Sequence, residues 1–209
     1  MSYSTSGSET GKDFPVEIRY HCSFKINSTH AIVTGGKQGW DVSESTWWVD
    51  LATTTFTPGP SMKTKRRVHG CATFQYEGKT FGIASGGYDE NQVPLDTTEI
   101  IDFDQENPTW TEGPKLPQKS AYLTLVKTYD GDTYALGGTC TKSQHYTDFI
   151  YDCGGRDRER SSEVLKLECP GEDQIQCCQW IEMPEKLEFA RKNHVSISIP
   201  ESHYFYCTN

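Results

Sequence analysis

Cysteine is the residue type in this chain whose spacing most directly tests for a chemical function. Cys22 and Cys71 lie apart, and the other six of the eight cysteines lie in the last third, at positions 140, 153, 169, 177, 178 and 207. Cys140, His145 and Cys153 could cluster, yet their spacing matches no common zinc pattern and the chain has no CxxC. Cys177 and Cys178 are adjacent, and on a strand their thiols would point to opposite faces, so they could not hold one metal ion together. We therefore expect no metal and no cofactor.

The cysteines also bear on the cellular compartment. An even number at this density is more usual in oxidising compartments, with Cys140 and Cys153 as one candidate pair, although cytosolic cysteines also pack as small apolar residues. Asn27-Ser28-Thr29 is a glycosylation acceptor sequence, a triplet that also arises by chance. The first 15 residues lack the apolar core of a secretory signal. The localisation stays open: cytoplasmic if Met1 is the true start, and secreted if an upstream signal peptide is missing.

Acid–base or nucleophilic catalysis has no defined centre in the sequence. The 29 acidic residues offer too many carboxylate pairs to choose from. His21, His69 and His194 recur at equivalent places of a repeat, whereas an active site would be built once. Neither a GxGxxG nor a lysine-bearing phosphate loop is present. We therefore expect a protein that is not an enzyme.

The charge balance excludes two classes of partner. A net charge of −9 and a pI near 5.1 repel nucleic acid and anionic lipid surfaces. No window approaches the ~20 apolar residues that a membrane-spanning helix needs. Nucleic acid and membrane are therefore not expected as partners.

The elements that would position a site follow from a repeat. "IVTGG", "GIASGG" and "YALGG" end in glycine pairs at Gly35-Gly36, Gly86-Gly87 and Gly137-Gly138, which are 51 residues apart (86 − 35 and 137 − 86). Glycine weakens a strand interior, so each pair marks the end of a strand. The interval is too regular for chance.

An acidic residue and an aromatic residue recur downstream of the glycine pairs. Asp50 lies six residues before Phe56, and Asp104 lies six before Trp110. Trp180 ends a third copy that has a longer turn. "YEGK" at 76–79 and "YDGD" at 129–132 are hairpin turns at matching places. Each unit therefore predicts four antiparallel strands in about 50 residues.

These features resemble the kelch repeat, a strand that ends in a glycine pair followed by a spaced tryptophan. The resemblance implies an all-β, kelch-type β-propeller in which the aromatic residues fill the wedges between blades. It also raises a role as a ubiquitin-ligase substrate receptor, although no BTB domain precedes the repeats. The expected units span about 17–60, 66–117 and 119–188, with a partial unit at 190–209.

Three and a half four-stranded blades predict an incomplete ring. Residues 1–16 are rich in Ser, Thr and Gly and are expected to form a disordered lead before the 17–209 repeats. Open strand edges invite pairing with another chain. The alternatives are a piece of a larger propeller, which we favour, a distorted four-bladed ring, or self-association through the edges.

Loops between the second and third strands are the expected binding elements, because function in repeat scaffolds concentrates on such loops. They span residues 37–45, 88–97 and 139–162, and the longest combines aromatic residues with arginines. The candidate binding residues are Trp40, Tyr146, Phe149, Tyr151, Arg156, Arg158 and Arg160. The long loop could equally fold on itself.

We expect a protein-binding module without catalysis, whose partner the sequence does not identify. The alternative is a carbohydrate-active or carbohydrate-binding propeller with its site in the central channel, and a gene fragment without independent function is a third reading.

Overall fold

The computed structural model describes residues 13–128, 131–140, 163–169 and 177–185, and in these residues the fold is all-β. Its strands form three four-stranded antiparallel sheets and two short strand pairs. Sheet one contains β1 (Cys22–Lys25), β2 (His30–Thr34), β5 (Thr46–Asp50) and β6 (Thr55–Pro58) in that order. The expected four-stranded antiparallel units are therefore confirmed.

Sheets two and three repeat the order of sheet one, with each strand beside the next one in the chain. Sheet two contains β7 (Gly70–Tyr76), β8 (Lys79–Ser85), β9 (Thr98–Asp102) and β10 (Trp110–Glu112). Sheet three contains β12 (Thr124–Lys127), β13 (Thr133–Leu136), β15 (Val164–Glu168) and β16 (Gln179–Glu182). None of the three sheets closes on itself.

The two short pairs lie where a chain enters or leaves a sheet. β3 (Lys37–Gln38) and β4 (Asp41–Val42) form a hairpin after the first glycine pair. β11 (Ser120–Ala121) precedes sheet three and pairs with β14 (Thr139–Cys140) after the third glycine pair. The segment that was expected to be a loop at 37–45 is therefore partly a hairpin.

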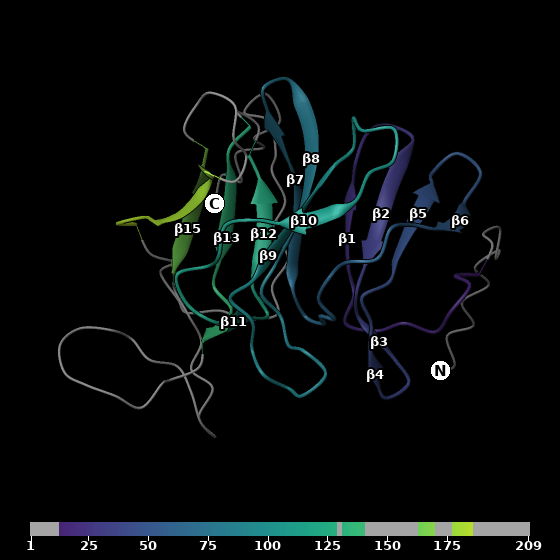
Figure 1. Cartoon of the computed structure of the whole chain (residues 1–209), viewed down its shortest axis with the longest axis horizontal. Helices are drawn as coiled ribbons and strands as arrows, with labels where there is room; N and C mark the ends of the chain where they lie inside the picture. Colours follow the sequence, from purple (N-terminus) through teal and green to yellow (C-terminus); the bar gives the residue numbers. More distant parts are fainter. Residues whose placement is uncertain (1–12, 129–130, 141–162, 170–176, 186–209) are drawn as a thin grey trace, which may run out of the picture.

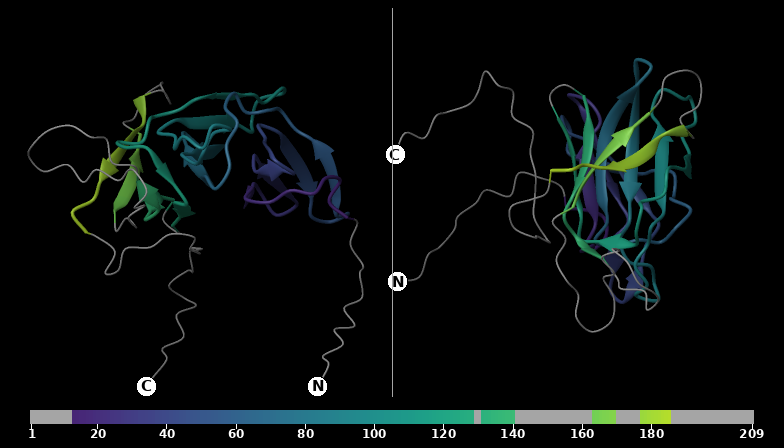
Figure 2. Two further views of the ribbon diagram at one scale, coloured as in Figure 1. Left: turned by 90° about the horizontal axis from the view of Figure 1, so that it is seen from below. Right: turned by 90° about the vertical axis from the view of Figure 1, so that its left-hand side faces the viewer.

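The sheets stand one after another along the molecule (Figure 1), and seen along the strands they follow a curve (Figure 2). The first strand of sheet two, β7, contacts the first strands of both neighbours, β1 and β12. Sheet two is thus covered on both sides, which explains why β8 and β9 are almost continuously buried. In β1, by contrast, half-buried and exposed residues alternate.

Two apolar clusters join the sheets. Trp110 of sheet two packs with Ile32 of sheet one and Met62 of the connecting segment. Trp180 of sheet three packs in a second cluster with residues of sheet two, among them Phe74 and Phe81. Both indoles are almost fully buried, at 2% and 5% exposure, as expected for residues that fill the space between sheets.

Strand register aligns the aromatic residues of the three units. Phe56 pairs with Val49, Trp110 with Ile101 and Trp180 with Leu167, at the same place in each sheet. Phe56 differs in its surroundings: its ring lies 4.8 Å from that of Phe14, which also packs against Trp47. Phe14 belongs to the segment expected to be a disordered lead, but its ring packs against Trp47 of β5 and Phe56 of β6.

The acidic positions are aligned differently from the expectation. Asp50 ends β5 opposite His30, and Asp102 ends β9 opposite Phe81. His30 and Phe81 each lie five residues before the glycine pair of their unit. The equivalent of Asp50 is therefore Asp102, and Asp104 lies two residues further along. Equal spacing to the aromatic residue suggested Asp104 because the paired residues Ile101 and Trp110 are nine apart in sequence, whereas Val49 and Phe56 are seven apart.

The glycine pairs follow β2, β8 and β13 directly, and all six glycines have positive φ. A Cβ on Gly35 would lie 2.4 Å from the carbonyl oxygen of Arg66, and one on Gly86 would lie 2.4 Å from that of Ser120. Those carbonyls belong to the segment that enters the next sheet. The pair is needed because backbone meets backbone at each joint between sheets.

A disulfide also ties sheet one to sheet two. Cys22 at the start of β1 is bonded to Cys71 in β7, across 49 residues of sequence. A second disulfide, Cys169–Cys178, joins the end of β15 to the residue before β16 in sheet three. The suggested pair Cys140 and Cys153 cannot be compared, because residue 153 lies outside the described residues.

Candidate binding surface

Trp40 is the most exposed large apolar side chain in the described part of the chain, at 87%. It lies with Gly39 in the two-residue turn of the β3–β4 hairpin, where Gly39 has a φ of +55°. The hairpin is held against the segment that precedes β1, because Lys37 and Arg19 exchange backbone hydrogen bonds of 2.7 and 3.1 Å. The Lys37 Nζ lies 5.0 Å from the centre of the Trp40 ring. The indole is therefore held in solvent beside a positive charge.

A row of alternating cationic and aromatic side chains runs from the base of this hairpin across the entries of the three sheets. Its members are Arg19, Tyr20, Arg67, Tyr88 and Tyr122, and we call it the cation–aromatic row. The Arg67 Cζ lies 6.0 Å from the ring centre of Tyr20 and 5.2 Å from that of Tyr88. Tyr88 in turn packs edge-on against Tyr122 at 5.9 Å.

Backbone geometry places this row at one end of the sheets. Tyr20, Val68 and Tyr122 precede the first strands of their units, and all three have positive φ, between 49° and 60°. The Val68 N–H donates to the Tyr20 carbonyl, and the Tyr122 N–H donates to the Val68 carbonyl, both at 2.8 Å. The entries of successive units are thus hydrogen-bonded to one another. Left-handed backbone is unusual for valine, so this joint is held by its surroundings.

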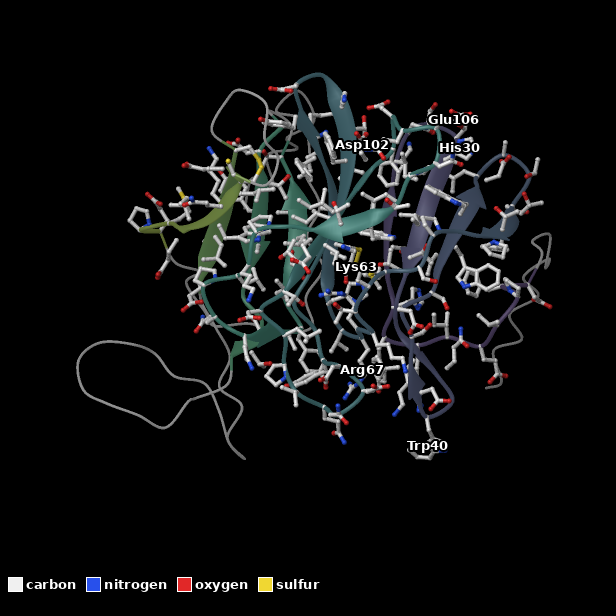
Figure 3. The ribbon with its side chains drawn as sticks, viewed as in Figure 1. His30, Trp40, Lys63, Arg67, Asp102 and Glu106 are labelled. Carbon is white, nitrogen blue, oxygen red and sulfur yellow. A yellow bond between two sulfur atoms is a disulfide. The ribbon has the colours of Figure 1, made fainter. Side chains whose placement is uncertain are left out.

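The cations of this end contact the hairpin and the aromatic rings: the Arg19 guanidinium donates to the Gly39 carbonyl at 3.2 Å, and Lys37 and Arg67 lie over rings. Among the described residues, Arg19, Lys37 and Arg67 make no salt bridge, whereas Lys65 pairs with Glu90 at 2.6 Å. Arg67 is half-buried and Arg19 is exposed. Figure 3 shows Trp40 and Arg67 at the same end of the molecule, with His30, Asp102 and Glu106 at the opposite end.

Arg66, the neighbour of Arg67, points the other way and is fully buried. Its guanidinium donates to Glu99 Oε1 at 2.8 Å and to the Gly86 carbonyl at 2.8 Å. Glu99 also accepts hydrogen bonds from the backbone N–H groups of Lys63 and Thr64. Burial lowers the pKa of Arg66, and the Glu99 carboxylate opposes that shift. This pair anchors the connecting segment to sheet two.

His69 is a structural residue in the same region. Its Nε2 lies 2.8 Å from the Thr34 hydroxyl of sheet one, so the ring bridges two sheets. Burial, together with the positive charge of Arg66 and with His21, holds the pKa of His69 well below its usual value. A neutral, buried ring that contacts only structural groups has no catalytic geometry.

Of the predicted binding residues, only Trp40 lies in the described part of the structure. The other six candidates, all between residues 141 and 162, lie outside the described residues: Tyr146, Phe149, Tyr151, Arg156, Arg158 and Arg160. Sequence reasoning missed Arg19, Tyr20, Arg67 and Tyr88. The repeated order of arginine, one residue and histidine at 19–21 and 67–69 was the signal that could have found the two arginines.

Other features of the described residues give weaker evidence for a functional site. A depression of about 430 Å³ on sheet three is lined by Asp132 and Lys166, which neutralise each other in an ion pair of 2.8 Å. In the residues that the structure describes, no group of three or more His, Cys, Asp or Glu side chains could hold a metal. The same residues contain no helix long and apolar enough to cross a membrane.

Comparisons with known proteins give a fold and no family. No protein-family model matches the chain, and no curated protein matches it. The solved structure of YjhT is similar over 88% of this chain, with a TM-score of 0.65 and 14% sequence identity. The match covers 60% of the YjhT chain. At this identity the likeness concerns the fold alone.

Proposed function

We propose that this chain is part of a kelch-type β-propeller that recognises a partner protein without catalysis. Three observations support the propeller: sheets of one strand order repeat along a curve, glycine pairs accommodate each joint, and equivalent tryptophans fill the spaces between sheets. The chain spans 60% of the YjhT chain, which is in keeping with a piece of a larger ring.

The binding site in this proposal combines Trp40 with three members of the cation–aromatic row, Arg19, Tyr20 and Arg67. Tyr88 is buried at 2% exposure and packs against Arg67 without forming part of the surface. The observation that carries it is the 87% exposure of Trp40 on a hairpin that the backbone fixes in place. Tryptophan and arginine dominate binding energy at protein interfaces because they bury a large area at modest entropic cost. A fixed hairpin adds to this by reducing the entropy lost on binding.

The charges of this end specify the kind of partner. Arg19, Lys37 and Arg67 present three positive charges on a protein whose net charge is −9. A segment that carries carboxylates beside an apolar side chain would place the apolar group on Trp40 and the carboxylates on Arg67 and Lys37. We therefore propose an acidic segment of a partner protein as the ligand.

The test uses a displayed library of acidic peptides selected on the full chain. Trp40→Ala should weaken the selected peptides by about 30-fold, which corresponds to about 2 kcal/mol. Arg67→Ala should weaken them as well and should reduce the dependence of affinity on salt. Leu51→Ala is the matched control, because Leu51 is another exposed apolar residue, in the β5–β6 turn.

Two results would decide against the proposal. Equal affinity of the Trp40, Arg67 and Leu51 variants would remove this surface as the site. Binding of neutral oligosaccharides on a glycan array, lost in Trp40→Ala, would favour the carbohydrate-binding alternative, since an exposed indole also suits a sugar face. Unchanged folding of each variant is checked by thermal unfolding.

A further inference from the structure

The turn between β1 and β2 carries the acceptor triplet that the proposed binding function does not use. The backbone N–H groups of Ile26 and Asn27 both donate to the His30 carbonyl, at 2.9 and 3.2 Å, and close a tight turn. Residues 27–30 are all exposed. The triplet therefore lies at the surface of sheet one, where a large substituent would displace no packed side chain.

The side chain of Asn27 is oriented by its carbonyl oxygen alone. Asn27 Oδ1 accepts hydrogen bonds from the Thr29 N–H at 2.9 Å, the Thr29 hydroxyl at 3.0 Å and the His30 N–H at 2.9 Å. Within the described residues, Nδ2 donates no hydrogen bond to the protein. The nitrogen that a glycan would occupy is thus not needed for the turn.

We propose that Asn27 carries an N-linked glycan. The reaction transfers an oligosaccharide from a lipid-linked diphosphate donor, catalysed by the oligosaccharyltransferase of the cell. A bond forms between Asn27 Nδ2 and C1 of the first sugar, the bond from C1 to the diphosphate oxygen breaks, and the lipid diphosphate leaves. Nδ2 loses one proton, and Thr29 supplies the hydroxyl that the acceptor sequence requires.

The disulfides support a compartment in which this reaction occurs. The Cys22–Cys71 disulfide joins β1 to sheet two, and β1 is the strand that leads into the Asn27 turn. Cys169–Cys178 is a second disulfide. Disulfides of this structural kind form in oxidising compartments, which in eukaryotic cells are the compartments of glycan transfer. Acceptor sequence, exposure and disulfides are independent observations that agree.

The position of the turn is compatible with the proposed binding surface. His30, next to the triplet, lies at the opposite end of the molecule from Trp40 and Arg67 (Figure 3). A glycan on Asn27 would therefore cover the β1–β2 end of sheet one, which is the end opposite to Trp40 and Arg67.

The chain contains its own negative control. Asn107-Pro108-Thr109 also has an asparagine two residues before a threonine, in the exposed β9–β10 turn. Proline at the middle position excludes it as an acceptor. Glycan chemistry should therefore distinguish Asn27 from Asn107 in the same molecule.

The first experiment is peptide mapping of the full-length protein isolated from its natural source. Peptide-N-glycosidase in heavy-oxygen water converts a glycosylated asparagine to labelled aspartate. Trypsin cuts after Lys25 and Lys37 and releases residues 26–37 as one short peptide. We expect labelled aspartate at position 27 and none at position 107, whereas an unlabelled peptide 26–37 overturns the proposal.

Variants of the full chain, secreted from eukaryotic cells behind a signal peptide, separate acceptor chemistry from folding. Asn27→Asp keeps Oδ1 for the turn but should abolish the glycan, and Thr29→Ala should abolish it by removing the hydroxyl. Ser28→Ala is the matched control and should keep full occupancy. Equal electrophoretic mobility of all four proteins, wild type included, with the Cys22–Cys71 bond intact, would contradict the proposal.

Discussion

Arg66 and His69 show how much of this molecule depends on single polar residues buried between sheets. Both lie in or next to the segment that joins sheet one to sheet two, and both are at most 5% exposed. Arg66 meets a carboxylate and backbone carbonyls, while His69 meets the Thr34 hydroxyl. Buried polar groups with defined partners fix a single arrangement of the units that they join.

His69 predicts a loss of stability in acid. Its pKa is lowered in the folded state, so below pH 6.5 the unfolded chain binds a proton that the folded protein excludes. The free energy of unfolding should therefore fall as the pH is lowered from 7.5 to 5.5 on account of this residue. Urea unfolding at the two pH values measures the effect.

The variant His69→Gln isolates that contribution. Glutamine can still hydrogen-bond to Thr34 but does not titrate, so the pH dependence should shrink by the same amount. His30→Gln, at an exposed position, should retain the dependence of the wild type. An identical pH dependence in the His69 variant and the wild type would refute the assignment.

At the scale of residues, the sequence predicted contacts within a unit better than contacts between units. Trp110 and Trp180 were expected in the core and are buried there. The burial of Arg66 and the bond between Cys22 and Cys71 were not foreseen, because both depend on where a neighbouring sheet lies. Arginine is rarely buried without a partner, and Glu99 lies 33 residues away in sequence.

The glycine pairs act at the scale of elements. The first glycine of a pair leaves room for the carbonyl that enters the next unit, and the N–H of the second donates to that carbonyl. Gly36 donates to Arg66 and Gly87 to Ser120, both at 2.8 Å. The glycine pair therefore ends one strand and also receives the carbonyl of the segment that enters the next sheet.

Gly86→Ala should destabilise the fold more than Gly78→Ala, and the difference measures the energetic effect of the close backbone approach at Gly86. Both glycines have positive φ, +65° and +74°, so both variants incur the left-handed penalty of about 1 kcal/mol. Only at Gly86 would the Cβ meet backbone, 2.4 Å from the Ser120 oxygen, while Gly78 has nothing within 4 Å. We expect Gly86→Ala to cost at least about 2 kcal/mol more by urea unfolding. Equal losses would mean that the close approach has no energetic weight.

At this scale the sequence predicted the strands well and the connections poorly. A strict interval between glycine pairs is a local signal, and it specified where β2, β8 and β13 end. The β3–β4 hairpin and the equivalence of Asp50 with Asp102 depend on turn length, which the spacing to an aromatic residue does not reveal.

For the whole molecule, the Cys22–Cys71 bond is the covalent link between two sheets that otherwise meet through packed side chains and backbone hydrogen bonds. It closes a long stretch of chain, whereas Cys169–Cys178 closes a short one, with sequence separations of 49 and 9. Cross-linking limits the unfolded chain more strongly when the loop is longer.

Removing the two disulfides should therefore have unequal effects. The Cys22→Ala, Cys71→Ala double variant should lose about 4 kcal/mol of unfolding free energy, and the Cys169→Ala, Cys178→Ala variant about 3 kcal/mol. Urea unfolding measures both, and addition of reductant to the wild type should lower its stability below that of either variant. A larger loss in the second variant would show that strain or packing outweighs loop length.

Beside the packed side chains, each joint between units has a main-chain part: carbonyls of entering segments, glycine amides, and the hydrogen bonds that connect Tyr20, Val68 and Tyr122. Main-chain atoms are common to every sequence, so this part of a joint does not require two side chains to change together. Gene duplication could then add or remove a unit, and the main-chain part of the new joint would form without further substitutions. The number of sheets in such a lineage would be free to vary, while the exposed hairpins changed separately.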